Sequence, residues 1–315
     1  MKLAIFMDPL AELKPAIDTS LALLERARRL GWSCYYFTKK DLFAEKGKIY
    51  AAVTAISVDT SIVSYQVDPQ PTVQALTDFD IILIRQDPPF DLGYLYATQL
   101  LSLVAQQGIL VSNHPQSLQQ HNEKLGILQY PDLCVPTLVS ADIARMKQFW
   151  KTHGSVIFKP LGSMGGDSVI HLAEDGRNLT VILQWLTKQE TLPIMAQRYI
   201  PEINTQGDKR IILINGNPVP YAFARFAAPG ESRANLCAGG TGTVIPISER
   251  DRHICAELGP KLREQSLYFV GIDVIGDYIT EINVTSPTCA RQITAETGLD
   301  IVGEYLIFLA SRAKS

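Results

Sequence analysis

The chain has 315 residues, of which 46% are hydrophobic and 19% charged, and its formal net charge is −3. This composition is typical of a globular protein with a large core and two or three domains. The small net charge and the lack of long Lys/Arg clusters give no reason to expect nucleic acid or an anionic membrane as a partner.

The five cysteines are widely scattered and show no C-x-x-C spacing. This pattern argues against a disulfide framework or a zinc site and favours a reducing compartment. No stretch approaches the roughly 18 apolar residues that a membrane span requires, and the N-terminal apolar run is too short for a signal peptide. We therefore expect a cytoplasmic protein.

The first third of the chain alternates apolar runs with amphipathic segments. Strands are predicted at 2–7, 33–37, 80–84 and 109–111, and helices at 17–30 and 92–107. This alternation predicts a parallel sheet with helices on both faces, whose strand carboxyl ends face a ligand crevice. Residues 41–71 are less regular and suggest short strands or a hairpin.

The next part of the chain predicts a helix at 116–129 and a helix capped by Ser140 that ends near His153. Further strands are predicted at 155–158, 169–172, 193–200, 207–214 and 219–226, and helices at 178–189, 248–265 and 300–313. The glycine-rich loop at 161–168 would let backbone N–H groups approach an anion, although such a loop by itself is more often a simple turn. Residues 227–242 show no pattern, and loops of this length tend to be functional lids.

Two β-forming runs near the C-terminal end flank the turn dipeptide Gly276-Asp277 and carry Asp273, Glu281 and Asn283. With a two-residue loop and regular pairing, Asp273 faces Thr280, and Glu281 and Asn283 point to the other side of the sheet. A longer loop or a bulge instead pairs Asp273 with Glu281 and puts Asn283 on the same face. We predict the second register, because paired carboxylates repel one another unless a cation lies beside them. For this stretch alone, two exposed acids on an edge hairpin are the alternative.

Several motifs resemble, in order, those of the bacterial glutathione synthetase family of the ATP-grasp superfamily. They are MDP at 7–9, RQDPPFD at 85–91, NEKL at 122–125, KPLGSMGG at 159–166, GDKR at 207–210, GIDVIGD at 271–277 and TEINVTSPT at 280–288. The resemblance covers nearly the whole chain and is weakest at 44–76. It implies an α/β fold whose ATP-grasp part is α+β. The implied domains are an N-terminal parallel-sheet α/β domain at 1–121, a small lid subdomain at 122–200 and a catalytic domain at 201–315 with a flexible loop at 227–242.

The resemblance implies that γ-glutamylcysteine and glycine are joined through an acyl phosphate, giving glutathione, ADP and phosphate from ATP. Mg²⁺ or Mn²⁺ would be held by Asp273, Glu281 and Asn283, since hard ions prefer oxygen ligands. The implied ATP contacts are Lys124, Lys159, Ser163, Gly165, Gly166, Gln197, Tyr199, Ile200 and Asp208. The implied catalytic residues are Arg210, Arg225 and Arg233, and the implied substrate contacts are Arg85, Arg225, Asn235, Ser286 and Thr288. The family also implies a homotetramer.

Alternatives follow from weighing the residues separately. Each Lys or Arg, taken singly, is more simply explained as a solvated surface charge. Another ATP-grasp ligase, such as a D-alanine ligase or a glutamate-adding ligase, is a second enzyme reading, against which the motifs at 85–91 and 280–288 argue. A non-catalytic ATP-binding module is a third, against which the retained Asp273, Glu281, Asn283 and Arg210 argue. The sequence does not identify a general base, and it leaves open whether glycine, β-alanine or serine is the acceptor.

Overall fold

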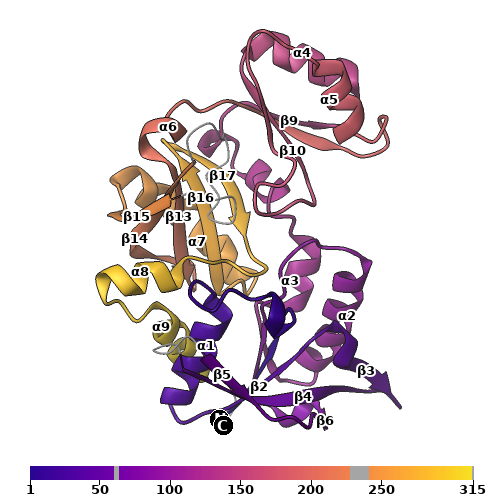
Figure 1. Cartoon of the computed structure of the whole chain (residues 1–315), viewed down its shortest axis with the longest axis vertical. Coiled ribbons are helices and arrows are strands. Elements are labelled where there is room, and N and C mark those ends of the chain that lie inside the picture. Colours follow the sequence, from indigo (N-terminus) through magenta and orange to yellow (C-terminus); the bar gives the residue numbers. More distant parts are fainter. Residues whose placement is uncertain (60–63, 228–240, 314–315) are drawn as a thin grey trace.

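The computed structural model describes residues 1–59, 64–227 and 241–313. These residues form three β-sheets, each built from one continuous part of the chain (Figure 1). The first sheet belongs to the N-terminal part, the second forms a small lobe that projects away from the rest, and the third lies in the C-terminal part. No helix of these described ranges is long and apolar enough to cross a membrane.

The N-terminal sheet has the predicted parallel centre. Its strands β2 (Ser33–Phe37), β1 (Lys2–Phe6), β7 (Ile81–Ile84) and β8 (Leu110–Ser112) lie side by side in this order, all parallel. The irregular segment extends the sheet with antiparallel strands: β4 (Lys48–Asp59) pairs with β2, and β3 (Leu42–Glu45), β5 (Ser64–Val67) and β6 (Thr72–Ala75) pair with β4. The sheet as a whole is therefore mixed.

Helices cover both faces of this parallel centre, because its middle strands are apolar: β7 at every position, and β1 at every position after Lys2. Leu3 and Ile5 pack with α1 (Thr19–Arg29), whereas Ala4 and Phe6 pack with α2 (Leu92–Gln106). Both helices begin at an aspartate: the Asp18 and Asp91 carboxylates accept hydrogen bonds of 2.7 Å from backbone N–H groups of the first turn, which satisfies donors that the helix leaves free.

The predicted helix at 116–129 is wrong. The chain forms α3 (Pro115–Gln120), breaks, and resumes as a 3₁₀ turn (Leu125–Gln129). At the break, the Asn122 side chain accepts hydrogen bonds of 3.0 Å from the backbone N–H groups of Lys124 and Leu125. The Glu123 carbonyl accepts one of 2.9 Å from Ile282 N. Local side-chain capping and a tertiary contact thus replace the helical hydrogen bonds.

The small lobe is an antiparallel sheet of β11 (Ile170–Leu172), β10 (Val156–Pro160), β12 (Ile194–Arg198) and β9 (Thr137–Ser140), covered by α4 (Ile143–His153) and α5 (Leu179–Leu186). The prediction that Ser140 caps α4 is wrong, because Ser140 ends β9. The cap is Asp142, whose carboxylate accepts a 3.0 Å hydrogen bond from Arg145 N.

The third sheet has the order β15 (Thr241–Pro246), β14 (Asn217–Phe226), β13 (Asp208–Ile214), β16 (Phe269–Ile275) and β17 (Tyr278–Asn283), and every neighbouring pair is antiparallel. Helix α7 (Glu249–Glu264) covers one face. The short helix α6 (Ile203–Gln206), β15 and α8 (Ala290–Thr297) were not predicted from the sequence.

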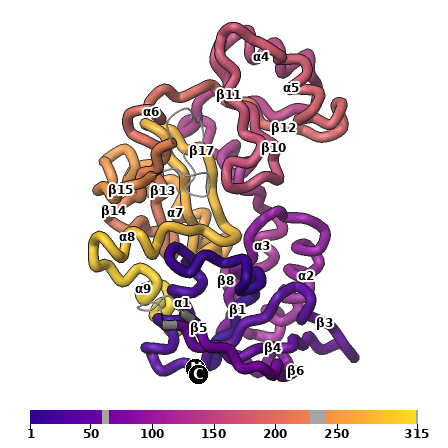
Figure 2. Tube along the Cα trace, in the orientation of Figure 1, coloured from indigo at the N-terminus to yellow at the C-terminus, as the bar shows by residue number. Residues whose placement is uncertain are grey.

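The hydrophobic cores show which sheets are bound together. The small lobe has a core of its own around Phe158 and Leu183. Two other cores each contain side chains of both the N-terminal and the C-terminal part. In Figure 2 the C-terminal helices α8 and α9 (Ile301–Ala310) lie beside α1, and α9 shares a core with it. The N-terminal and C-terminal sheets are thus packed as one body that carries the small lobe.

Candidate active site

One face of the five-stranded sheet carries a row of buried charges. Cross-strand pairing sets Asp208 on β13 opposite Arg225 on β14, and Arg210 on β13 opposite Asp273 on β16. Asp208 and Arg210 share a face because side chains alternate along a strand. The other face, under α7, is apolar at neighbouring positions such as Ile211. The sheet can therefore bury a core on one side and assemble charges on the other.

The β16–β17 hairpin has the register that the sequence analysis favoured. Asp273 pairs with Glu281, and Gly271 pairs with Asn283, so the three candidate metal ligands share a face. The loop is nevertheless only Gly276-Asp277, because Val274 pairs with Ile279. Thr280 is the extra residue of a β-bulge, and this bulge reconciles the short turn with the same-face register.

Asp273 is the centre of the charged row. Arg210 binds it through two nitrogens, with Nε at 2.5 Å from Oδ1 and Nη2 at 3.0 Å from Oδ2, and Arg225 Nη2 lies 2.9 Å from Oδ1. Burial alone would raise the pKa of Asp273, but the two guanidinium groups lower it below its ordinary range. The carboxylate therefore stays ionised. Asn283 Nδ2 also donates to it over 3.2 Å.

Asp208 has the opposite balance. Arg225 Nη2 lies 2.6 Å from its Oδ2. Even so, burial raises the pKa of Asp208 to about 6, and the nearby Asp273 adds to this effect. Asp208 therefore has a higher pKa than Asp273. The reason is that two arginines contact Asp273, whereas one arginine is hydrogen-bonded to Asp208.

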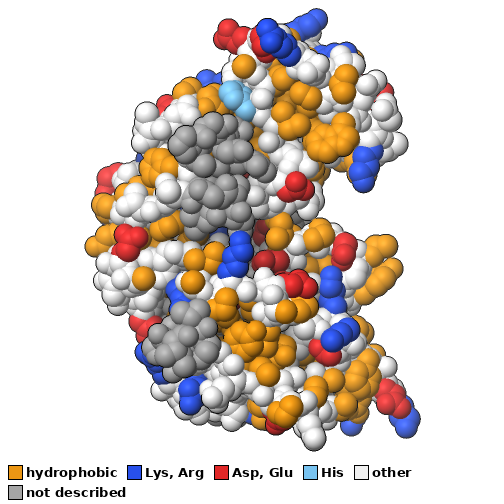
Figure 3. All heavy atoms as spheres, in the orientation of Figure 1, with side chains coloured by type: hydrophobic (Ala, Val, Ile, Leu, Met, Phe, Trp, Pro, Cys, Tyr) orange, Lys and Arg blue, Asp and Glu red, His pale blue; other side chains and the backbone are white. Residues whose placement is uncertain are grey.

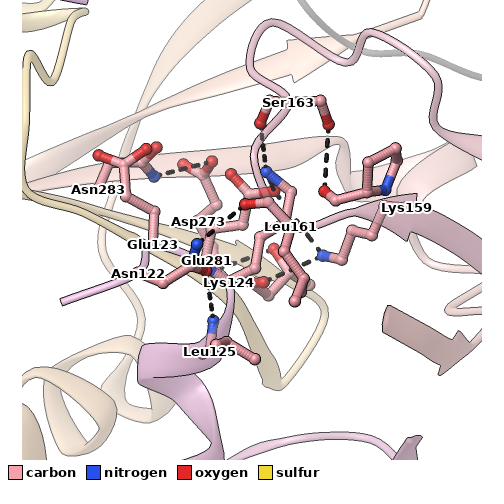
Figure 4. Close-up of polar contacts among 12 residues, drawn as sticks. Asn122, Glu123, Lys124, Leu125, Lys159, Leu161, Ser163, Asp273, Glu281 and Asn283 are labelled. Carbon is pink, nitrogen blue, oxygen red and sulfur yellow. Dashed lines mark hydrogen bonds and ion pairs between the residues drawn. The ribbon is translucent and has the colours of Figure 1, made fainter. Parts of the chain in front are cut away.

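Two buried lysines from other parts of the chain face β17, the strand that carries Glu281 and Asn283 (Figure 4). Lys124 Nζ donates to the Ser163 carbonyl over 2.5 Å and lies 3.5 Å from Glu281 Oε1. Lys159 Nζ donates to the carbonyl of the bulged Thr280 over 3.2 Å and lies 3.8 Å from the same Glu281 oxygen. Burial lowers the pKa of Lys159, and the Glu281 charge opposes that shift. Lys124 therefore connects the glycine-rich loop to the break after α3, and Lys159 connects β10 to β17.

The glycine-rich loop and the end of β12 complete the small-lobe side. Gly165 and Gly166 have φ values of 62° and 76°, which side-chain-bearing residues rarely adopt. Gln197 is buried in β12, where its Nε2 donates to Thr137 Oγ1 over 3.1 Å. Tyr199 follows this strand and stacks on His171 with 4.1 Å between ring centroids.

A cavity of about 470 Å³ joins these groups. Figure 3 shows the molecule hollowed between the small lobe and the remaining body. The cavity lining includes most of the residues that the sequence analysis selected: Lys124, Lys159, Ser163, Gly165, Gly166, Gln197, Tyr199, Ile200, Asp208, Arg210, Arg225, Asp273, Glu281, Asn283, Ser286 and Thr288. Sixteen residues from separate parts of the chain therefore meet at one place.

Arg85 is not among the residues that line this cavity. It is buried, with Nε 3.2 Å from Ser20 Oγ and Nη2 2.9 Å from the carbonyl of Pro287, and its Nη1 has no hydrogen-bond partner within the described ranges. The structure thus sets it behind the segment that carries Ser286 and Thr288. Arg233 and Asn235 lie outside the described residues.

Glu123 and Asp87 are among the acids that line the cavity, and sequence reasoning gave neither of them a chemical role. Glu123 accepts three hydrogen bonds from Val284 and Thr285, the residues that follow β17. Asp87 follows β7, and burial raises its pKa to about 6 although a Ser286 hydrogen bond opposes the shift. Both acids lie inside motifs, NEKL and RQDPPFD, so motif membership was the available signal.

The candidate metal ligands fit a hard cation in their chemistry. Asp273, Glu281 and Asn283 offer carboxylate and amide oxygens from one face of one hairpin. Both carboxylates already contact cationic side chains, which shows that this position favours positive charge. Within the ranges that the structure describes, no group of three or more His, Cys, Asp and Glu side chains could hold a metal ion.

Solved structures show the fold. D-cycloserine synthetase DcsG superposes with a TM-score of 0.71 at 13% identity over 100% of both chains. The ATP-grasp ligase PsnB superposes with a TM-score of 0.63 at 17% identity over 98% of each chain. At such low identity the likeness concerns the fold alone, which is that of the ATP-grasp ligases.

Sequence comparisons are more specific. The family model of the prokaryotic glutathione synthetase N-terminal domain matches residues 1–119, and that of the ATP-grasp domain matches residues 123–298. Glutathione synthetase of Pseudomonas putida is 44% identical over 315 residues, which are 100% of this chain and 99% of that protein. The Pseudomonas aeruginosa glutathione synthetase is 47% identical over 293 residues, 93% of this chain and 92% of that protein. The chain therefore belongs to the prokaryotic glutathione synthetase family.

Proposed function

We propose that this protein, an ATP-dependent carboxylate–amine ligase by its family, joins γ-glutamylcysteine to glycine and produces glutathione, ADP and phosphate. The observation that carries the proposal is the cavity in which two lysines and two arginines meet three oxygen-bearing side chains on one hairpin. Transfer of a phosphoryl group followed by attack on an acyl phosphate gathers negative charge, and such a site stabilises it with groups that are already in place.

In the first step, a carboxylate oxygen of γ-glutamylcysteine attacks the γ-phosphorus of ATP. The bond from that phosphorus to the bridging oxygen breaks, and ADP leaves with the electron pair. Lys124 and Lys159 hold the phosphates, while Ser163, Gly165 and Gly166 cover them with the glycine-rich loop. The segment with Gln197, Tyr199 and Ile200 holds the adenine, and Asp208 lies toward the ribose and phosphates. The buried position of both lysines strengthens their attraction for phosphate oxygens.

In the second step, the glycine nitrogen attacks the carbonyl carbon of the acyl phosphate and loses a proton to water. The C–O bond to phosphate then breaks, and inorganic phosphate leaves. Arg210 and Arg225 stabilise the charge of the acyl phosphate and of its tetrahedral successor. Their planar forks suit this role, since each can present two parallel N–H donors to an oxyanion.

Asp273, Glu281 and Asn283 would hold Mg²⁺ or Mn²⁺. A hard cation held there would neutralise part of the negative charge of the phosphate groups. The Arg210 and Arg225 contacts of Asp273 keep that carboxylate ionised, as a ligand to a hard cation must be.

We propose that Ser286 and Thr288 position glycine, and that Arg85 supports them by holding the Pro287 carbonyl between them. Arg233 and Asn235 are proposed from the sequence as residues that shield the acyl phosphate from water and bind substrate. We also propose the domain limits 1–121, 122–200 and 201–315, a homotetramer and a cytoplasmic location. The three separate sheets support these limits.

The test is an assay of purified protein with ATP, Mg²⁺, γ-glutamylcysteine and glycine. Glutathione and phosphate should form in equal amounts, as measured by chromatography and a phosphate assay. Parallel reactions with β-alanine or serine in place of glycine establish the acceptor. Absence of glutathione at saturating substrates would reject the proposal.

A further inference from the structure

The peptide groups that follow Asn283 are held by two side chains from outside the five-stranded sheet. β17 is an edge strand of the sheet, since β16 is its one strand neighbour among the described residues. An edge strand has free backbone groups on its outer side, and its position is less well fixed than that of a central strand. Asn283 is the last residue of β17, so its position depends on what holds the chain just beyond it.

Glu123 holds this segment from the outer side of the strand. Its Oε1 accepts hydrogen bonds from Val284 N at 2.9 Å, from Thr285 N at 3.0 Å and from Thr285 Oγ1 at 2.8 Å. Its backbone carbonyl also accepts the N–H group of Ile282 at 2.9 Å. One residue therefore binds the chain immediately before and immediately after Asn283.

Asn113 holds the same segment from the N-terminal sheet. Its Nδ2 donates to the carbonyls of Val284 at 2.7 Å and Phe269 at 2.9 Å, and its Oδ1 accepts from the N–H groups of Tyr268 at 2.8 Å and Phe269 at 2.9 Å. The partners fix the orientation of this amide, because both acceptors face its nitrogen and both donors face its oxygen. Asn113 is buried and fully satisfied, and it joins the start of β16 to the end of β17.

The two side chains meet at the main chain of Val284, whose N–H binds Glu123 and whose carbonyl binds Asn113. We propose that Asn113 and Glu123 are positioning residues that fix Asn283 from outside the metal site and thereby set the affinity for the divalent cation. The inference rests on the proposed function of Asp273, Glu281 and Asn283 as metal ligands. Residues that orient metal ligands typically change metal affinity by about 10-fold to 100-fold when removed.

The test is the affinity of the full-length protein for Mn²⁺ in the presence of ADP, measured from the electron paramagnetic resonance signal of free Mn²⁺. We expect Glu123→Ala and Asn113→Ala each to raise the Kd for Mn²⁺ by about tenfold. Glu123→Gln keeps an oxygen that can accept the hydrogen bonds, so its Kd should stay within about threefold of the wild type. The double alanine variant should show less than the product of the single effects, since both act on Val284.

Asp251 offers a matched control on the other side of the sheet. Its Oδ1 accepts from Lys209 Nζ at 2.6 Å and its Oδ2 from Ser248 N at 2.9 Å, and it is buried on α7. Asp251→Asn should lower the melting temperature and leave the Kd for Mn²⁺ unchanged. This variant shows what loss of a buried carboxylate does when that carboxylate makes no hydrogen bond to residues 282–285.

The possible outcomes distinguish failure of the positioning role of Asn113 and Glu123 from failure of the proposed ligase reaction. Alanine variants that melt earlier, as Asp251→Asn does, but bind Mn²⁺ as tightly as the wild type would show a purely structural role and overturn the inference. Should Asn113→Ala not fold, Glu123→Ala and Glu123→Gln decide the matter alone. Wild-type protein that binds no Mn²⁺ with ADP would also overturn it. Wild-type protein that binds Mn²⁺ but makes no glutathione would reject the proposed reaction, and the binding test of the variants would still stand.

Discussion

The N-terminal sheet and the five-stranded sheet differ in where they carry charged side chains. In the first, Leu3, Ile5 and Ile81 are 0% exposed, and the ionisable groups Asp8 and Arg85 appear only where strands end. In the second, β13 carries Asp208 and Arg210 within the strand. A parallel strand that is covered by helices on both faces has no side left for polar groups. An antiparallel sheet with one face on a core can assemble chemistry on its other face.

The difference shows where stability and function depend on the same residues. In the parallel sheet, a side chain contributes through the apolar area that it removes from water, and reactive groups lie in the loops. In the five-stranded sheet, each buried charge needs its partner, so removing one leaves another without compensation. We therefore expect variants of the first sheet to change stability alone and variants of the second to change both stability and catalysis.

The largest effect is expected for Arg210→Ala. This change removes two hydrogen bonds to Asp273 and one of the two guanidinium groups that we propose stabilise the acyl phosphate. We expect kcat to fall by about 100-fold to 1000-fold, as for loss of one donor to a developing oxyanion. Phosphate release measures the rate, and Arg210→Lys is the control that keeps the charge but loses the fork. A decrease of less than tenfold would mean that Arg210 has only a structural role.

Leu83→Ala tests the other side of the comparison. Leu83 is fully buried in β7, between β1 and β8. The cavity left by the change should lower the free energy of unfolding by about 3 kcal/mol. Urea denaturation followed by circular dichroism measures this value. At a temperature where the variant is folded, its kcat should equal that of the wild type. A lower kcat would mean that variants of the first sheet also affect catalysis.

Asp87→Asn tests an acid at the end of a parallel strand. Burial raises the folded-state pKa of Asp87 from 3.8 to about 6, so the folded protein holds this proton to a higher pH than the unfolded chain. The wild type therefore loses stability as the pH rises from about 4 to about 6. The variant lacks this loss, and its free energy of unfolding relative to the wild type should rise by about 2 kcal/mol across that window. Urea titrations at several pH values measure the difference, and a parallel pH dependence of both proteins would refute the prediction.

The smallest effect is expected for Ser248→Ala at the start of α7. Ser248 Oγ accepts from Asp251 N over 3.1 Å, and Asp251 Oδ2 accepts from Ser248 N over 2.9 Å, which together form a capping box. Loss of the hydroxyl should cost about 1 kcal/mol of unfolding free energy. Because α7 covers the core face of the five-stranded sheet, kcat should not change. A change in kcat would show that the two faces of this sheet are coupled.

The hairpin at the metal site shows how far sequence patterns reach. The Gly276-Asp277 dipeptide predicts a two-residue turn, and the chemistry of Asp273 and Glu281 predicts a shared face. The two predictions conflict in a regular ladder, and both are correct because Thr280 is bulged. The position of the bulge could not be predicted from the strand residues. It coincides with a hydrogen bond from Lys159, a residue distant in sequence, to the Thr280 carbonyl.

The predicted helix at 116–129 failed, and Arg85 lies away from the cavity, for a related reason. The helical pattern at 116–129 continues through Asn122 and Glu123, but these side chains bind Leu161 and the end of β17 instead of leaving the helix intact. Arg85 directly follows a parallel strand, where a ligand contact is expected, yet it points behind the cavity to Pro287. In both cases a distant backbone group offered a hydrogen bond that the local pattern does not contain.

The sequence by itself determined the apolar strands, the capped helices, the family motifs and the residue types that suit a phosphate and metal site, because these follow from local periodicity and side-chain chemistry. Only the tertiary structure decided which face each charge occupies, that Arg85 is withdrawn, and that Asn113 and Glu123 meet at Val284. The last two outcomes depend on hydrogen bonds between residues more than 150 positions apart, as in the 161-residue separation of Glu123 and Val284. No local pattern encodes such a pairing, because it forms only when separate sheets pack together.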